Sequence, residues 1–175
     1  MKYLDDFGVP NSVYPCTKYL TFGYWIYMVP QYKPESVLML GYAGGTAAGL
    51  IRLIYGDIPI TGVDITPSEN LYNVNLIQAD AREFVKTCGK YDAVLVDLFP
   101  NDSHDICDFV TKKDFVKNLA RISNYVVINA GSKPDLANYK IFRYVGRNIP
   151  YRQGVAIYYF ATKEIPDLFP QIETQ

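Results

Sequence analysis

The amino-acid sequence predicts an α/β fold: a doubly wound, mostly parallel β-sheet with helices on both faces. Short β-branched runs alternate with helical patterns along most of the chain. The predicted strands are continuously apolar, as expected where both faces of a parallel sheet are covered. The last two runs are joined by a segment without a helical pattern, so they are expected to pair antiparallel and make the sheet mixed.

The size and composition of the chain suit one domain. Its 175 residues can bury a sizeable core, and with 49% hydrophobic and 20% charged residues the chain is expected to fold. We therefore predict a single domain over residues 1–175, in which residues 1–36 are a helical N-terminal extension. A nearly all-round apolar helix at residues 17–28 would cover a sheet edge or a partner's surface.

The first half of the predicted sheet begins with a strand at residues 37–40. This strand ends in the turn Gly41-Tyr42-Ala43-Gly44-Gly45-Thr46, and a helix over residues 47–55 follows. A second strand covers residues 58–63, with Pro59 near its start. The sequence Thr66-Pro67-Ser68-Glu69 has the form of a capping box and predicts a turn or two of helix before a third strand at residues 74–78.

The second half continues the alternation. A short helix is predicted over residues 82–88, the most apolar strand over residues 93–96, and a polar loop over residues 101–110. Thr111 and Asp114 are predicted to cap a helix that runs to about Ile122, and a fifth strand follows at residues 125–129. The tail is predicted as two strands, residues 141–145 and 155–160, paired antiparallel.

Charge and cysteine content restrict the partners and the compartment. With 17 Lys and Arg against 18 Asp and Glu, a broad nucleic-acid surface is not expected. The three cysteines are far apart and lack a metal-binding spacing, which fits reduced thiols and predicts no metal site. The N-terminus has no apolar signal region, and no uncharged run could span a bilayer. We therefore expect a soluble cytoplasmic protein without a membrane partner.

Acidic residues follow three successive predicted strands, at the sheet edge where open α/β folds bind ligands. Asp64 follows the second strand, Asp80 and Ala81 the third, and Asp97 the fourth. The glycines after the first strand let a ligand approach the backbone and the N-terminus of the next helix. The pattern predicts a nucleoside site in which Asp64 accepts from ribose hydroxyls and contributes little to packing. Asp80 would accept from an adenine amine, and the backbone around Ala81 would contact the ring.

Four segments occur in an order and spacing that resemble a known family: residues 37–46, 61–64, 78–84 and 91–97. They resemble the class I S-adenosylmethionine-dependent methyltransferase superfamily, and within it most the spermidine-synthase-like branch. The resemblance covers residues 37–129 and implies a three-layer, Rossmann-like methyltransferase sheet with an antiparallel C-terminal strand. It implies S-adenosylmethionine or decarboxylated S-adenosylmethionine as the cofactor. The cofactor-binding residues predicted with it are Gly41, Tyr42, Ala43, Gly44, Gly45, Asp64, Ile65, Asp80, Ala81 and Asp97.

The sequence departs from the spermidine-synthase pattern at two positions. Those enzymes carry an Asp where Gly44 stands, and a second acid where Pro100 stands, three residues after Asp97. They also have an N-terminal β-hairpin region that adds substrate contacts. Aminopropyl transfer to a polyamine is therefore one alternative and not the first expectation.

The acceptor side of the predicted site is acidic. Asp97, Asp102, Asp105 and Asp108 lie at or after the fourth strand and favour a small cationic or amine acceptor. His104, the only histidine, lies among them and could act as a general base, although a solvated loop histidine is the alternative. Asp97 and His104 are the predicted catalytic residues.

Three functions remain open from the sequence. The first is a small S-adenosylmethionine-dependent methyltransferase with an unknown acceptor. The second is an aminopropyltransferase that uses decarboxylated S-adenosylmethionine. The third is a non-catalytic nucleoside-binding or homo-oligomerising module that has the fold without the acceptor chemistry.

Overall fold

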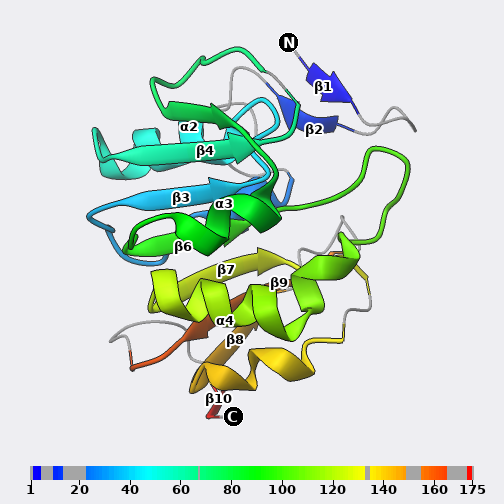
Figure 1. The fold of residues 1–175 in the computed structure, drawn as a ribbon. Coiled ribbons are helices and arrows are strands. Elements are labelled where there is room, and N and C mark those ends of the chain that lie inside the picture. The colour runs from blue at the N-terminus through cyan, green and yellow to red at the C-terminus, as the bar shows by residue number, and fades with distance from the viewer. Residues whose placement is uncertain are drawn as a thin grey trace.

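An eight-stranded sheet in the order β10-β8-β9-β7-β6-β3-β4-β5 forms the centre of the computed structural model (Figure 1). The structure describes residues 2–4, 10–13, 23–66, 68–132, 135–148, 155–164 and 173–174. The parallel strands are β3 (Val37–Leu40), β4 (Ile60–Asp64), β5 (Asn75–Gln78), β6 (Ala93–Val96) and β7 (Tyr125–Asn129). The antiparallel strands are β8 (Tyr144–Asn148), β9 (Ile157–Ala161) and β10 (Glu173–Thr174). The predicted mixed sheet and its antiparallel tail are confirmed.

Helices cover both faces of this sheet and make three layers. Figure 1 shows α3 (Ala81–Thr87) and α4 (Lys113–Ile122) in front of the sheet and α2 (Thr46–Tyr55) behind it. Side chains alternate between the faces. Val37 and Met39 belong to the apolar cluster on the α2 side, whereas Leu38 and Leu40 belong to the cluster on the α3 and α4 side. The predicted three-layer fold is confirmed, and its parallel strands all end at one edge.

The predicted helix between β4 and β5 is wrong, because the described residues of 65–74 form no helix. Asn70 organises this connection: its side-chain amide donates to the carbonyl of Val74 at 2.7 Å, and its Oδ1 accepts from the Val74 N–H at 3.0 Å. Asn73 adopts a left-handed φ of 51°. An Asn-based turn therefore replaces the helix that the capping-box sequence indicated.

The cap of α4 and the start of the first tail strand also differ from prediction. Thr111 does not cap α4, because it lies in the short 3-10 helix η2 (Asp108–Thr111) and its hydroxyl donates to the Asp108 carbonyl at 3.2 Å. The first tail strand begins at Tyr144, because a second 3-10 helix, η3 (Ala137–Ile141), occupies the preceding residues.

The N-terminal extension is not purely helical. Strands β1 (Lys2–Leu4) and β2 (Pro10–Val13) pair antiparallel within it. The predicted helix at 17–28 appears as α1 (Trp25–Met28), and residues 17–22 lie outside the described part. Trp25 and Met28 are buried in the α2-side cluster, so α1 covers a face of the sheet and not an edge. No helix of the described residues is long and apolar enough to cross a membrane.

Candidate functional site

A cavity of about 360 Å³ lies at the edge where the parallel strands end. It brings together most of the residues predicted from the sequence: Gly41, Tyr42, Ala43, Asp64, Ile65, Asp80, Ala81 and Asp97. Gly44, Gly45 and His104 are not among its lining residues. The strand ends therefore meet at one site, as the acid-at-strand-end pattern predicted.

Gly41 fixes the distance between β3 and β6 at this edge. Its φ is +85°, and a Cβ there would collide with the carbonyl oxygen of Asp97. The N–H of Gly41 donates to Val63 at 2.9 Å, and the N–H of Asp97 donates to Leu40 at 2.8 Å. Glycine is required because the backbone of the turn lies directly against the backbone of Asp97.

Tyr42 packs beneath the turn and explains two more glycines. Its side chain is 2% exposed. A Cβ at Gly45, where φ is +77°, or at Gly62 would collide with the Tyr42 ring. Gly45 therefore shapes the turn from behind and leaves the N-terminus of α2 open to the cavity, where Thr46 and Ala47 line the wall.

Asp64 ties the end of β4 to the turn. Its Oδ2 accepts from the N–H of Ala43 at 2.8 Å, and its Oδ1 accepts from the N–H of Thr66 at 2.9 Å. Ala43 has a φ of 47°, which is uncommon for a residue with a side chain. Asp64 therefore also holds the turn, in addition to the ribose role predicted for it. Since a carboxylate has about four lone-pair sites, it can still accept from ligand hydroxyls.

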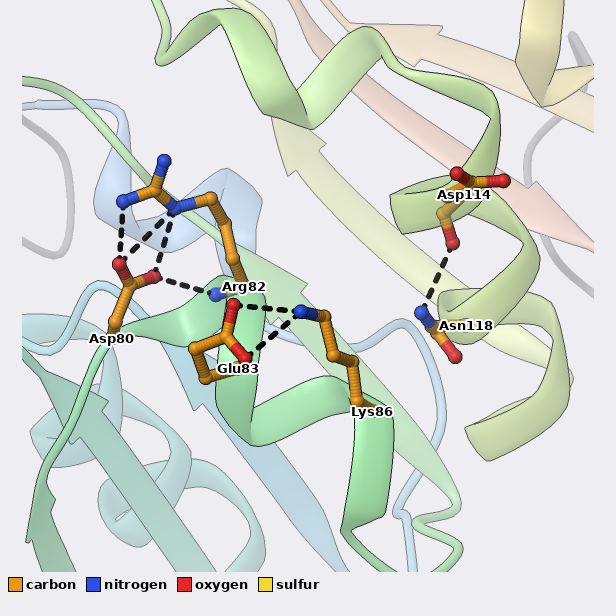
Figure 2. Close-up of polar contacts among 6 residues, drawn as sticks. All are labelled: Asp80, Arg82, Glu83, Lys86, Asp114 and Asn118. Carbon is orange, nitrogen blue, oxygen red and sulfur yellow. Dashed lines mark hydrogen bonds and ion pairs between the residues drawn. The ribbon is translucent and has the colours of Figure 1, made fainter.

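Asp80 is paired with Arg82, a cation that was not predicted as a site residue. Figure 2 shows the Arg82 side chain folded back onto the Asp80 carboxylate, with Arg82 Nη2 2.6 Å from Oδ2. Asp80 also caps α3, because Oδ1 accepts from the N–H of Arg82 at 2.8 Å. These contacts with Arg82 hold the pKa of Asp80 below its usual value. The guanidinium also lies over the ring of Phe109, 5.0 Å from its centroid.

Asp97 has neutral hydrogen-bond partners instead. The Tyr24 hydroxyl donates to its Oδ2 at 2.8 Å, and the Asn129 side-chain amide donates to its Oδ1 at 2.9 Å. Burial raises the pKa of Asp97 to about 6; the two hydrogen bonds oppose this rise, and the nearby Asp64 carboxylate adds to it. Asp97 can therefore bind a cation and can exchange a proton near neutral pH.

Tyr24 and Asn129 were not predicted as site residues. Asn129 ends β7, the strand next to β6, so the rule that located the three acids could have found it. Tyr24 lies 73 residues before Asp97 at the start of α1, and no spacing in the sequence indicated that contact.

The loop after β6 does not supply the predicted acidic mouth. Its ends are tied by a hydrogen bond from the Cys107 N–H to the Leu98 carbonyl at 2.9 Å. His104, Asp102, Asp105 and Asp108 are exposed and do not line the cavity, whereas Leu98, Phe99, Pro100 and Asn101 do. Of the four acids predicted there, the structure places Asp97 at the cavity. No cluster suited to a metal ion occurs among the described residues.

The inner wall of the cavity is apolar. It consists of Trp25, Met28, Met39, Tyr42, Ala47 and Leu95, each at most 6% exposed, and we call this part the apolar chamber. Met39 and Leu95 are register partners on β3 and β6. The site therefore joins a polar rim at the strand ends to a chamber that reaches the hydrophobic core.

Solved structures with the same fold include methyltransferases and spermidine synthases. Human methyltransferase-like protein 13, in complex with SAH, aligns with a TM-score of 0.65 and 15% identity over 78% of this chain and 76% of its own. A probable spermidine synthase from Corynebacterium glutamicum aligns with a TM-score of 0.60 and 18% identity over 74% of this chain. Spermidine synthase from Thermotoga maritima aligns with a TM-score of 0.52 and 17% identity over 80% of this chain.

These similarities define the class of fold. The chain has the Rossmann-like fold of class I S-adenosylmethionine-dependent methyltransferases, which spermidine synthases share. It spans 57% and 58% of the lengths of the two synthases. No family model matches the sequence, and no curated protein does.

Proposed function

We propose that the chain binds S-adenosylmethionine, or its decarboxylated form, in the cavity and transfers a group from it to a small acceptor. Methyl transfer is the first candidate. The observation that carries this proposal is the convergence of the Gly41 turn, Asp64 and Asp97 on one cavity of about 360 Å³. This volume lies within the roughly 300–1,000 Å³ that ligand pockets occupy.

The rim of the cavity suits a nucleoside. Asp64 has lone pairs beyond those that hold the turn, and these could accept from ligand hydroxyls. Ile65, next to it, is 69% exposed although it is large and apolar, and it lines the cavity. An apolar side chain left open beside a hydroxyl-binding carboxylate fits the face of a nucleobase. Asp80 would contact that base with the lone pairs that Arg82 leaves free.

Asp97 is the proposed catalytic residue at the acceptor end. S-adenosylmethionine, when bound, supplies a methyl group on a positively charged sulfur that an acceptor lone pair can attack. Asp97 would bind a protonated amine and accept the proton that the amine must lose before it acts as a nucleophile. No covalent enzyme intermediate is needed, so the chain mainly positions the reactants. His104, which is exposed outside the cavity, is not part of this proposal.

Aminopropyl transfer from decarboxylated S-adenosylmethionine is the second candidate, and one observation favours it. Among the described lining residues, Arg82 is the cationic one, and it is paired with Asp80. A ligand carboxylate in the cavity would therefore find no unpaired cationic side chain among these residues, whereas a decarboxylated ligand needs none.

Thermal unfolding of the protein with S-adenosylmethionine, decarboxylated S-adenosylmethionine and methylthioadenosine tests the proposal. A ligand at 100 times its Kd raises the free energy of unfolding by about 2.7 kcal/mol. We expect a rise in Tm that Asp64→Asn reduces and that the exposed-loop variant Asp102→Asn leaves unchanged. A larger shift with the decarboxylated ligand would select aminopropyl transfer. No shift with any of the three would refute the proposal and favour a non-catalytic module.

A further inference from the structure

The apolar chamber and Asp97 lie on the same face of the sheet. Side chains two residues apart on a strand point to the same side, so Asp97 follows Leu95 on the α2 side of β6. Asp97 therefore stands one step closer to the sheet edge than the chamber floor formed by Met39 and Leu95.

The start of α1 borders both Asp97 and the apolar chamber. Tyr24 hydrogen-bonds the Asp97 carboxylate, and the next residue, Trp25, lines the chamber with Met28. One short segment thus contacts both the charged end and the apolar part. A ligand that touches Asp97 has the chamber directly beside it.

Of the charged residues around the cavity, one carboxylate lies next to the apolar chamber. The charged residues among the described lining residues are Asp64, Asp80, Arg82 and Asp97. Asp80 is paired with Arg82, and Asp64 lies on β4, held by the N–H groups of Ala43 and Thr66. Asp97, bonded to two neutral donors, is the acid beside the chamber.

We infer that the acceptor is a monoamine with a short apolar tail, whose nitrogen binds Asp97 and whose tail lies in the chamber against Met39, Leu95 and Trp25. This inference rests on the proposed function, since it names the acceptor class of that transferase. A diamine is disfavoured, because its second ammonium group would lie among apolar side chains without a partner. Pro100, three residues after Asp97 on the cavity wall, offers no second carboxylate.

Calorimetric titration of the full chain with a matched set of four-carbon ligands tests this inference. Butylamine has the charge and the tail, butane-1,4-diamine adds a second charge at equal length, and butan-1-ol lacks the charge. We expect butylamine to bind roughly tenfold or more tightly than either of the others, because each loses one of the two contacts. Equal or tighter binding of the diamine would overturn the inference.

Adenosine, titrated separately, keeps the proposed function distinguishable, because it probes the nucleoside site alone. Adenosine binding without butylamine binding would overturn the inference and leave the nucleoside site intact. Butylamine binding without adenosine binding would support the amine site and count against the transferase. If neither ligand binds, both proposals fail.

Two variants on α2 locate the amine tail. Ala47→Leu adds bulk inside the chamber on a residue type that helices accept, and we expect it to weaken butylamine binding by roughly tenfold. Leu53→Ala changes an exposed position of the same helix, 52% exposed, and should leave that binding unchanged. Circular dichroism checks that both variants fold. Equal butylamine affinity in a folded Ala47→Leu protein would place the tail outside the chamber.

Discussion

Asp80 and Asp97 each follow a strand of the same sheet and line the same cavity, but their surroundings are opposite. Asp80 accepts hydrogen bonds from the backbone and the guanidinium of Arg82, which hold its pKa below the usual value. Asp97 is half-buried against two neutral donors, and burial raises its pKa to about 6. The same residue type is thus a permanent charge at one strand end and an exchangeable proton site at the other.

The difference shows how position on a strand end sets the role of a carboxylate. Asp80 stabilises the start of α3 and has its cation within the same turn, so its charge is neutralised locally. Asp97 has no cationic partner among the described residues it contacts, and it opposes folding at neutral pH. Strongly perturbed pKa values concentrate at functional sites, and this supports assigning the proton-transfer role to Asp97.

The largest expected effect comes from Gly41→Ala, which disturbs the backbone beside Asp97 and does not touch Asp80. The added Cβ would collide with the Asp97 carbonyl at a φ of +85°. We expect a loss of about 3 kcal/mol or more in the free energy of unfolding, or no folding at all. The matched control is Gly89→Ala, where the Cβ meets open space. Urea denaturation of both variants checks this, and near-equal losses would contradict the close approach at Gly41.

Asp97→Asn should stabilise the protein at neutral pH. In the wild type, the unfolded chain ionises Asp97 near pH 4 but the folded chain only near pH 6. The free energy of unfolding should therefore fall as pH rises through this window, by on the order of 2–3 kcal/mol. In the variant, the free energy of unfolding should not decrease in this pH window, while Tyr24 and Asp64 still face the site. Denaturation midpoints of both proteins between pH 3.5 and 7.5 measure this pH dependence.

Asp80→Asn is the matched control for this experiment and should act in the opposite direction. Because the pKa of Asp80 is lowered, its charged form stabilises the fold above the unfolded pKa, and that stability is lost as the pH falls. Asn remains a good N-cap. We expect a small destabilisation at pH 7, and a stabilisation like that of Asp97→Asn would contradict the contrast between the two acids.

Asp64→Asn should weaken nucleoside binding, and it also removes the charge that adds to the raised pKa of Asp97. Charge-assisted hydrogen bonds to hydroxyls contribute about 1.5 kcal/mol or more, so affinity for methylthioadenosine should fall by roughly tenfold. The amide keeps one oxygen for the turn, so a modest loss of stability is expected as well. Calorimetry at equal folded fraction separates the two effects. Unchanged affinity would remove Asp64 from the ribose position.

Arg82→Ala should have the smallest effect. The Asp80–Arg82 pair is largely solvated, with 55% of the Arg82 side chain exposed, and exposed pairs contribute little to stability. We expect a near-unchanged Tm and a rise in the pKa of Asp80 toward its usual value. A Tm drop as large as that of Gly41→Ala would show that the pair does more than fix the Asp80 charge.

The sequence predicts the strand ends well because strand, turn and acid are local features. Gly41, Asp64, Asp80 and Asp97 each follow a short apolar run, and the parallel order places them at one edge. The Asp97–Tyr24 hydrogen bond was not predictable, because it joins residues 73 apart in the sequence and no periodic pattern places Tyr24 beside the end of β6. The helix expected after Thr66 failed because local Asn70 hydrogen bonds compete with helix formation.

The exposure of the loop acids could not be read from their spacing either. Asp102 and Asp105 follow Asp97 closely, but the hydrogen bond between Cys107 and Leu98 closes the loop and turns them to solvent. The apolar chamber likewise depends on α1, which packs against α2 and β7 and brings Trp25 and Met28 into the cluster of Met39 and Leu95. This tertiary contact has no sequence signature.

One cavity of this protein holds both a fixed carboxylate, Asp80, and a proton-exchanging one, Asp97. A pH titration of the carboxyl carbon resonances by NMR, with Asp80→Asn and Asp97→Asn used for assignment, tests it directly. We expect the Asp97 resonance to titrate with a pKa of about 6 and the Asp80 resonance below its usual value. Titration of Asp97 at or below the value of Asp80 would contradict the claim and remove the proton-accepting role from the site.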